Sequence, residues 1–174
     1  MNNPQEDTGR LDRGDGVALA WARLDGRGPT VVFLPGFASD MSGGKATALA
    51  EACRRAGRAL LRFDYSGHGA SGGAFADGTI GRWRDDALAA IDRLTEGPLI
   101  LVGSSMGGWI ALLAALARPG RVAGLVGVAA APDFTERLMW QAMAPAEQAA
   151  LLAAGHLDLP SQYGPPTRIT RALI

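Results

Sequence analysis

LILVGSSMGGW, residues 99–109, carries the strongest structural signal in the chain. Its first four residues are an unbroken apolar run, which is typical of a strand buried on both faces of a parallel sheet. The residues from Trp109 to Ala117 are mostly apolar and predict a helix. Between the two lies 103–107, with the pattern G-x-S-x-G. A serine on a tight strand-to-helix turn is therefore the first candidate for chemistry.

Ser105 fits this pattern and Ser104 does not. Glycines lie two residues to either side of Ser105, whereas Ser104 has Val102 and Met106 at that spacing. Such a turn strains the backbone, and the helix after it directs its N–H groups and positive dipole end at the serine. The alternative is a glycine-rich turn in which the hydroxyls only cap a helix. The strand before and the helix after favour a nucleophile elbow.

Leu34-Pro35-Gly36-Phe37 provides a second part of the candidate site. It ends the apolar, β-branched run at 30–34, which predicts another buried strand. In this architecture the loop after that strand donates one N–H to an oxyanion, and the residue after the serine donates the other. We therefore predict an oxyanion hole made by the backbone N–H groups of Phe37 and Met106. The alternative is a plain strand-ending turn.

Strands alternate with helices along most of the chain, which predicts a mostly parallel sheet with helices on both faces. We expect strands at 17–23 (an edge strand), 30–34, 58–64, 99–102 and 122–129, and helices at 43–56, 79–94 and 109–117. The polar residues 1–16 are expected to form a flexible N-terminus, so that one domain covers 17–174. The remaining elements are two short helices that form an insertion at about 133–160, a loop at 160–168 and a further element from 169.

Four segments together resemble the α/β-hydrolase superfamily. They are LPGF at 34–37, RFDYSGHG at 62–69, WRDD at 83–86 and LVGSSMGGW at 101–109. The resemblance covers about residues 15–174 and is to the branch of the mitochondrial palmitoyl-protein thioesterase, which is also an acyl-glucuronide esterase, and its bacterial relatives. It implies a serine esterase or thioesterase that forms an acyl-enzyme on Ser105 and uses no cofactor and no metal.

The resemblance also implies a catalytic triad in the order serine, acid, histidine, with the acid after the seventh strand and the histidine after the eighth. The chain is expected to end before those C-terminal strands. His68 is expected to be structural in its loop, and His156 to face the last carbonyls of a helix. Asp133 is an alternative acid, and Asp64 is expected to tie down its loop. The alternative function is a catalytically incomplete fragment, pseudoenzyme or binding protein.

Composition limits the other function classes. Lys plus Arg and Asp plus Glu balance at 17 each, which argues against a nucleic-acid or anionic-membrane surface. The single cysteine, Cys53, excludes an internal disulfide and is expected in the core, and no apolar run is long enough to span a membrane. The composition, rich in Arg, Ala and Gly, is typical of a bacterial protein. The polar residues 1–16 contain no apolar run typical of a secretory signal, and a single cysteine is typical of a reducing compartment, so we expect the protein in the cytoplasm. We expect a small-molecule or acylated substrate, and self-association through an uncovered sheet edge.

Apolar side chains near the elbow have two interpretations. Met139, Trp140 and Met143 lie at helical spacing and are expected in the core, with a lid over an acyl chain as the alternative. Trp109 is expected to pack against its neighbours, with lining of an acyl pocket as the alternative.

Overall fold

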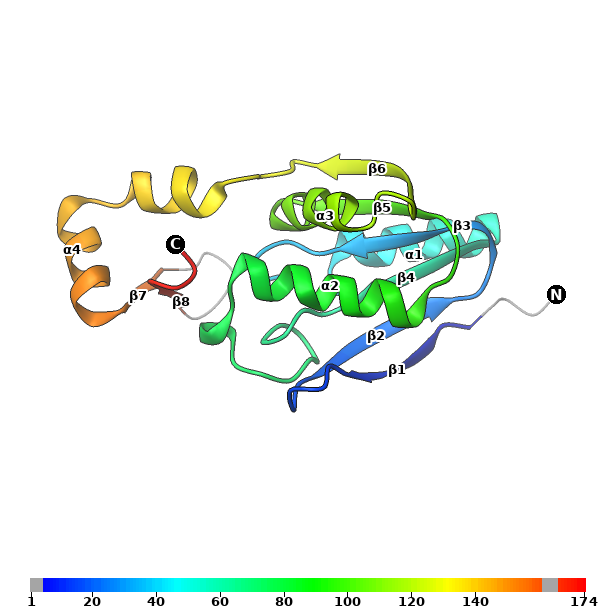
Figure 1. Ribbon diagram of the computed structural model, residues 1–174, viewed down its shortest axis with the longest axis horizontal. Helices are drawn as coiled ribbons and strands as arrows, with labels where there is room; N and C mark the ends of the chain where they lie inside the picture. The colour runs from blue at the N-terminus through cyan, green and yellow to red at the C-terminus, as the bar shows by residue number, and fades with distance from the viewer. Residues whose placement is uncertain (1–4, 161–165) are drawn as a thin grey trace.

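A six-stranded sheet with the order β1-β2-β4-β3-β5-β6 forms the centre of the computed structural model, which describes residues 5–160 and 166–174 (Figure 1). The strands are β1 (Asp7–Asp12), β2 (Ala18–Leu24), β3 (Arg27–Leu34), β4 (Arg58–Phe63), β5 (Leu99–Ser104) and β6 (Val122–Val128). β3, β4, β5 and β6 run parallel, whereas β1 and β2 form an antiparallel edge. The predicted mostly parallel sheet is confirmed.

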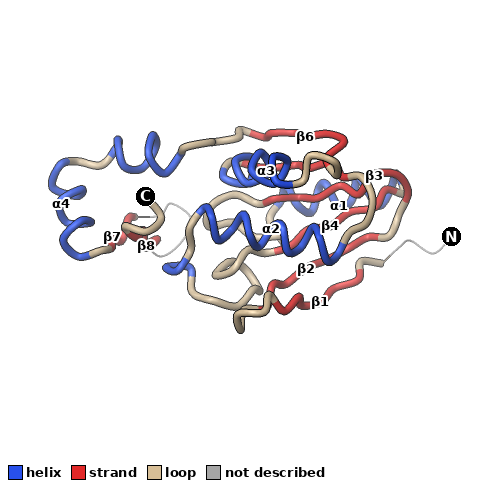
Figure 2. The backbone as a smooth tube through the Cα atoms, in the orientation of Figure 1, coloured by secondary structure: helices blue, strands red, loops and turns tan. Residues whose placement is uncertain are grey.

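Helices cover both faces of this sheet (Figures 1 and 2). They are α1 (Gly44–Ala56), α2 (Ile80–Leu94) and α3 (Met106–Ala117). α1 packs Ala50 and the buried Cys53 against one face, next to Val31. α2 and α3 lie side by side on the other face, over a larger core that contains Val32 and Leu101. Adjacent residues of a strand thus enter different cores, as expected where a strand is buried on both sides.

Local signals explain where these helices begin and end. The side chain of Thr79 caps α2 by accepting a hydrogen bond from the N–H of Arg82 at 3.0 Å. Gly57, in the left-handed region with φ of 61°, ends α1. α3 begins at Met106 rather than at the expected Trp109, because the backbone turns directly from Ser105 into the helix. Its first N–H group therefore lies next to Ser105.

The N-terminus corrects two expectations. β1 pairs with β2 over its whole length, so the expectation of a flexible segment at 1–16 is wrong for 7–12, and residues 1–4 lie outside the described residues. β2 is an inner strand rather than the expected edge strand. Leu11 is the one apolar residue of β1 and is buried, and the other five are polar or glycine. A strand of that composition lacks the alternation by which strands are recognised.

The expected helical insertion follows β6, and we call residues 133–159 the post-β6 segment. It contains a π-helical turn (Thr135–Met139), a 3₁₀ turn (Trp140–Ala142), α4 (Pro145–Ala154) and β7 (His156–Leu159). β7 pairs in an antiparallel direction with β8 (Thr167–Thr170), a hairpin that the sequence did not predict because both strands have only four residues. The loop expected at 160–168 lies mostly outside the described residues, since 161–165 are not described.

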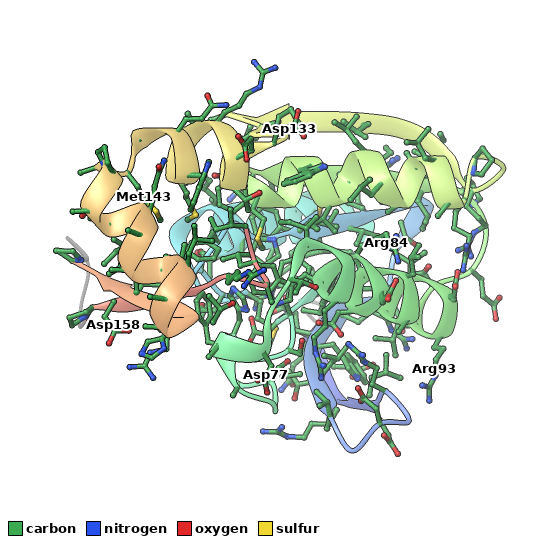
Figure 3. The ribbon with its side chains drawn as sticks, turned by 60° about the vertical axis from the view of Figure 1, so that its left-hand side comes forward. Asp77, Arg84, Arg93, Asp133, Met143 and Asp158 are labelled. Atoms are coloured by element: carbon green, nitrogen blue, oxygen red, sulfur yellow. The ribbon has the colours of Figure 1, made fainter. Side chains whose placement is uncertain are left out.

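The post-β6 segment is packed onto the main core. Phe134, Met143 and Leu151 are buried in that core, together with Ile169 and Leu173 from the residues that follow. Figure 3 shows where Asp133 and Met143 lie along this part of the chain. Among the described residues, no helix combines the length and the apolar character needed to cross a membrane.

Candidate active site

Ser105 forms the turn between β5 and α3 with φ of 51° and ψ of −119°. A non-glycine residue keeps such a conformation only where its surroundings hold it. The N–H of Ser105 donates to the C=O of Val128 at 3.0 Å, and its C=O accepts from the N–H groups of Gly108 at 2.9 Å and Ala131 at 3.1 Å. The Ser105 residue is exposed, whereas Ser104 and the start of α3 are buried. The strained turn predicted from G-x-S-x-G is therefore present, with Ser105 at its tip.

Backbone atoms crowd this turn from both sides. A methyl group added at Gly107 would collide with the C=O oxygens of Leu34 and Pro35. Gly108 is packed as tightly against Ala130, where an added methyl group would collide with its Cβ. The motif predicts the need for Gly107 but not for Gly108, because Ala130 is distant along the chain. The end of β3, the chain after β6 and α3 therefore meet at this turn, with no room for a side chain at Gly107 or Gly108.

The end of β3 lies directly beside the turn. A methyl group added at Gly36 would lie 3.4 Å from Cβ of Ser105. Phe37 follows Gly36, and no acceptor for its N–H is found in residues 5–160 and 166–174; the same holds for the N–H of Met106. Met106 also stands at the positive end of the α3 dipole. Free N–H groups beside an exposed serine are the donors that an oxyanion requires.

Backbone strain is concentrated at this end of the sheet. In the described part of the chain, the non-glycine residues with positive φ are Ala38 (52°), Ser105 (51°), Ala129 (49°) and Asp133 (58°). Each follows the C-terminal end of β3, β5 or β6. That edge is where ligands bind in parallel α/β sheets, and strained residues cost about 1–3 kcal/mol each and cluster at functional sites. The strain therefore favours a functional role for this edge.

Aromatic rings surround Phe37. Its ring centroid lies 5.1 Å from that of Phe75, 5.9 Å from Trp83 and 5.6 Å from Phe134. Phe134 also meets Trp109 edge-on, at 6.1 Å. Trp109 therefore takes part in packing, as expected, while its residue remains partly exposed.

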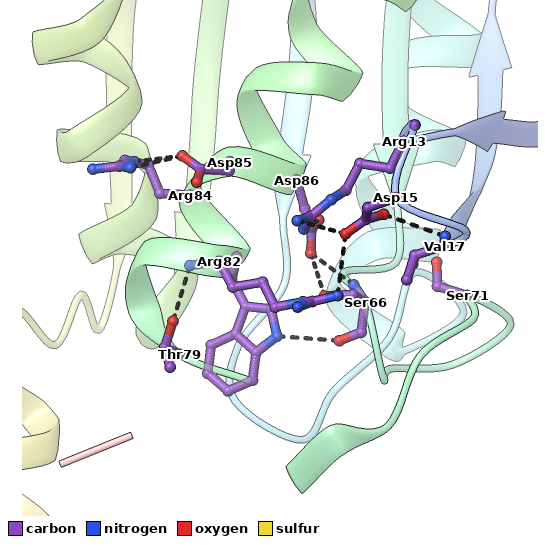
Figure 4. Close-up of polar contacts among 12 residues, drawn as sticks. Arg13, Asp15, Val17, Ser66, Ser71, Thr79, Arg82, Arg84, Asp85 and Asp86 are labelled. Atoms are coloured by element: carbon purple, nitrogen blue, oxygen red, sulfur yellow. Dashed lines mark hydrogen bonds and ion pairs between the residues drawn. The ribbon is translucent and has the colours of Figure 1, made fainter. Parts of the chain in front are cut away.

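A buried polar network holds the loop that contains Ser66 (Figure 4). Asp86 is fully buried and accepts hydrogen bonds from the N–H of Ser66 at 2.8 Å, from its Oγ at 2.7 Å and from Arg13 at 2.5 Å. The C=O of Ser66 accepts from the Trp83 indole N–H at 3.1 Å. A buried polar group is tolerated only with partners of this kind. Asp86 and Trp83, both in α2, therefore fix the Ser66 loop against this helix.

Asp64 connects the same region to the loop that carries Phe37. Its carboxylate accepts from the N–H of Met41 at 2.7 Å and from that of Ala70 at 2.8 Å. Burial raises the pKa of this carboxyl group above its ordinary value. The side chain does tie down its loop, and it joins that loop to a second one.

Neither histidine of the described residues is hydrogen-bonded to Ser105. His68 is buried among the rings of Tyr65, Phe75 and Trp83, with Nδ1 3.2 Å from the C=O of Ser66. Burial lowers the pKa of its imidazole. His156 is exposed on β7, with Nδ1 3.2 Å from the C=O of Ala154 at the end of α4. These surroundings are those of a structural and a helix-end histidine.

The remaining candidates lie in or at the start of the post-β6 segment. Asp133 is exposed, and its C=O accepts from the N–H of Arg137 at 2.8 Å. Its carboxylate has no hydrogen-bond partner in the described part of the chain. Met143 is buried, and Met139 and Trp140 are partly buried against the main core, in line with the expectation of core positions.

A mostly parallel sheet of this strand order, with an exposed serine on a strained turn at the end of β5, defines an α/β hydrolase. The sequence matches the serine aminopeptidase S33 family over residues 27–170. The chain belongs to this family of serine hydrolases.

Relatives and solved structures agree with this assignment. The chain is 45% identical over 153 residues to mouse mitochondrial palmitoyl-protein thioesterase ABHD10, covering 88% of this chain and 51% of that protein. The human protein of that name is 51% identical over 123 residues, or 71% of this chain and 40% of that protein. The structure of mouse α/β-hydrolase domain-containing protein 10 superposes with a TM-score of 0.84 at 42% identity, covering 96% of this chain and 67% of that one. The resemblance to the thioesterase branch is thus confirmed.

A second solved structure, from Agrobacterium vitis S4, has a TM-score of 0.83 at 39% identity, with 99% of this chain and 70% of that chain covered. The chain therefore spans about half the length of the mouse and rat relatives and about two thirds of these structures.

The comparisons contradict two expectations about origin and compartment. The mouse, rat, cattle and human relatives are mammalian proteins named as mitochondrial, so the expectations of a bacterial and of a cytoplasmic protein are wrong. They rested on composition, on the single cysteine and on the polar N-terminal residues, none of which identifies the compartment in which a fold works.

Proposed function

We propose that the protein hydrolyses carboxylic esters or thioesters through an acyl-enzyme on Ser105. The observation that carries the proposal is the exposed Ser105 on its strained turn, beside the free N–H groups of Phe37 and Met106. Oγ of Ser105 attacks the substrate carbonyl carbon while a base takes its proton, and both N–H groups donate to the oxyanion. The C–S or C–O bond then breaks, the leaving group takes the proton, and water releases the acid in a second attack.

The mechanism needs a histidine and an acid to activate Ser105. The two histidines have other contacts, and the chain spans about half the length of the mouse relative. Hydrolysis is therefore proposed for a form of the protein in which a histidine and an acid reach Ser105. The same observation favours a second candidate: a hydrolase fold that binds an acylated ligand without turning it over.

A long-chain acyl thioester is the substrate class that we propose. The mammalian relatives are named palmitoyl-protein thioesterases. The partly exposed rings of Phe37 and Trp109 beside the turn offer an apolar surface, which suits an acyl chain better than a polar group.

Covalent labelling by a fluorophosphonate tests the proposal. An activated serine attacks phosphorus and releases fluoride, whereas an unactivated serine stays unlabelled. We expect intact-protein mass spectrometry to find one adduct and peptide mapping to assign it to Ser105, with no adduct on Ser104. Absence of label on the chain with Ser105 intact would support the binding protein instead.

We also propose that the 174-residue chain associates with itself through β6. This strand is at the edge of the sheet, and its Leu125, Val126 and Val128 are 38%, 48% and 38% exposed. An apolar edge strand with free backbone groups is a template for pairing. We expect sedimentation velocity to show association that increases with concentration. Val126→Lys places a charge on this edge strand, and we expect it to reduce the association. A monomer at all concentrations would contradict the proposal.

A further inference from the structure

Phe134 contacts both halves of the proposed oxyanion hole. It is 6% exposed, and its ring meets that of Phe37 at 5.6 Å and that of Trp109 at 6.1 Å. Phe37 carries one of the proposed donors on its own backbone. Trp109 lies in the first turn of α3, three residues after Met106, which carries the other. One side chain from the post-β6 segment therefore joins the loop after β3 and the first turn of α3, whose N–H groups must converge.

The backbone of Phe37 itself makes no hydrogen bond among the described residues, although the turn around it is closed by one. In the loop after β3, the N–H of Ser39 donates to the C=O of Gly36 at 3.2 Å, and Met41 is held by Asp64. No hydrogen bond to the N–H or the C=O of Phe37 itself is found within the described residues. Ala38, which follows, has a positive φ of 52°. A strained stretch keeps its conformation only where its surroundings hold it. Here one backbone hydrogen bond closes the turn, and the ring contacts of Phe37 supply the side-chain part of that support.

Two of those ring contacts come from a rigid support. Trp83 is fully buried and held through Ser66 and Asp86. The backbone of Phe75 packs closely against Gly67: a methyl group added at Gly67 would lie 2.6 Å from the backbone nitrogen of Phe75. Phe134 is the remaining contact, and it alone among the three comes from a segment that begins at the strained Asp133.

We infer that Phe134 is a positioning residue that sets the Phe37 N–H relative to the Met106 N–H. The inference rests on the proposed function, because it assigns those two groups to the oxyanion. Phe134 acts through Phe37 and Trp109 and contributes no polar group itself. The post-β6 segment thereby becomes part of the catalytic geometry as well as part of the core.

Hydrogen–deuterium exchange of Phe134→Leu tests the positioning without requiring turnover. Leucine keeps an apolar side chain at the site and removes both ring contacts. We expect the amide of Ser39, which closes the turn around Phe37, to exchange roughly three- to tenfold faster, the range that the loss of an aromatic pair implies. Leu138→Ala is the matched control, because Leu138 lies in the same segment and is 66% exposed. It should leave the exchange of Ser39 unchanged.

Thioester hydrolysis by the same variants then links the position to catalysis. A misplaced donor weakens transition-state binding and leaves ground-state binding intact, so we expect kcat of Phe134→Leu to fall roughly tenfold at constant KM. Unchanged exchange at Ser39, or faster exchange with unchanged kcat, would overturn the inference. A protein with Phe134 intact that neither labels at Ser105 nor hydrolyses thioesters would instead overturn the proposed function, whatever the exchange shows.

Discussion

Replacement of Ser105 by alanine is expected to abolish hydrolysis by any form of the protein that turns over esters or thioesters. The variant loses the only group that forms the acyl bond, while the Phe37 and Met106 N–H groups remain. In comparable serine hydrolases the loss of the nucleophile lowers kcat by about 10⁶-fold, so we expect a loss of at least about 10³-fold here. The measurement is steady-state release of thiol from an acyl thioester, with the mass spectrum checked for an acyl adduct.

Ser104→Ala is the matched control for this experiment. The two hydroxyls are adjacent in sequence, but the Ser104 residue is 7% exposed and belongs to β5, whereas Ser105 is exposed at the turn. We expect the control to retain the activity and the adduct of the unmodified chain. Activity of Ser105→Ala within about tenfold of the unmodified chain would rule out Ser105 as the nucleophile, because the loss of a nucleophile lowers kcat far more than that.

Local signals in the sequence were sufficient for the central part of the fold. The runs at 30–34 and 99–102 are apolar without interruption, and both are strands with neighbours on two sides. The hydroxyl of Thr79 marks the start of α2 and the left-handed backbone of Gly57 marks the end of α1, because each acts on backbone groups only a few residues away. Such signals depend on neighbours along the chain, and a single sequence contains those neighbours.

β1 and the β7–β8 hairpin could not be predicted for the opposite reason. β1 has one apolar residue, Leu11, and is held in place by pairing with β2 and by the ion pair of Arg13 with Asp86 in α2. Asp86 is remote along the chain, and although β2 follows soon after β1, nothing in DTGRLD indicates either partner. The β7–β8 pair has four residues in each strand, too few for an alternating pattern to be distinguished from chance.

The candidate site likewise has a part that could be predicted from the sequence and a part that could not. Ser105, Phe37 and Met106 were predicted because the chemistry of an elbow requires those positions relative to a strand end. The ring contacts of Phe37 with Phe75 and Phe134 were not, since they join three segments that only the fold brings together. The need for Gly108 was missed for the same reason, as its neighbour Ala130 comes from the chain after β6.

Gly107→Ala is expected both to destabilise the fold and to remove the reactivity of Ser105. The added methyl group would collide with the C=O oxygens of Leu34 and Pro35 and would lie 2.6 Å from the carbonyl carbon of Leu34. All these atoms belong to the backbone of β3 and its end, so no rotamer change can relieve the contact. Overpacking of cores costs about 1–3 kcal/mol and occasionally more, and we expect about 3 kcal/mol or more here. Urea unfolding measures this loss, and fluorophosphonate labelling measures the reactivity.

Gly120→Ala distinguishes this effect from the general cost of replacing a glycine. A methyl group at Gly120 meets no atom within 4 Å, and its φ is not positive. We therefore expect its free energy of unfolding to stay within about 0.5 kcal/mol of the unmodified chain. If Gly107→Ala behaved like Gly120→Ala, β3 and α3 would not meet at the elbow. The convergence of the Phe37 and Met106 N–H groups depends on that meeting, so the proposed oxyanion hole would lose its basis along with it.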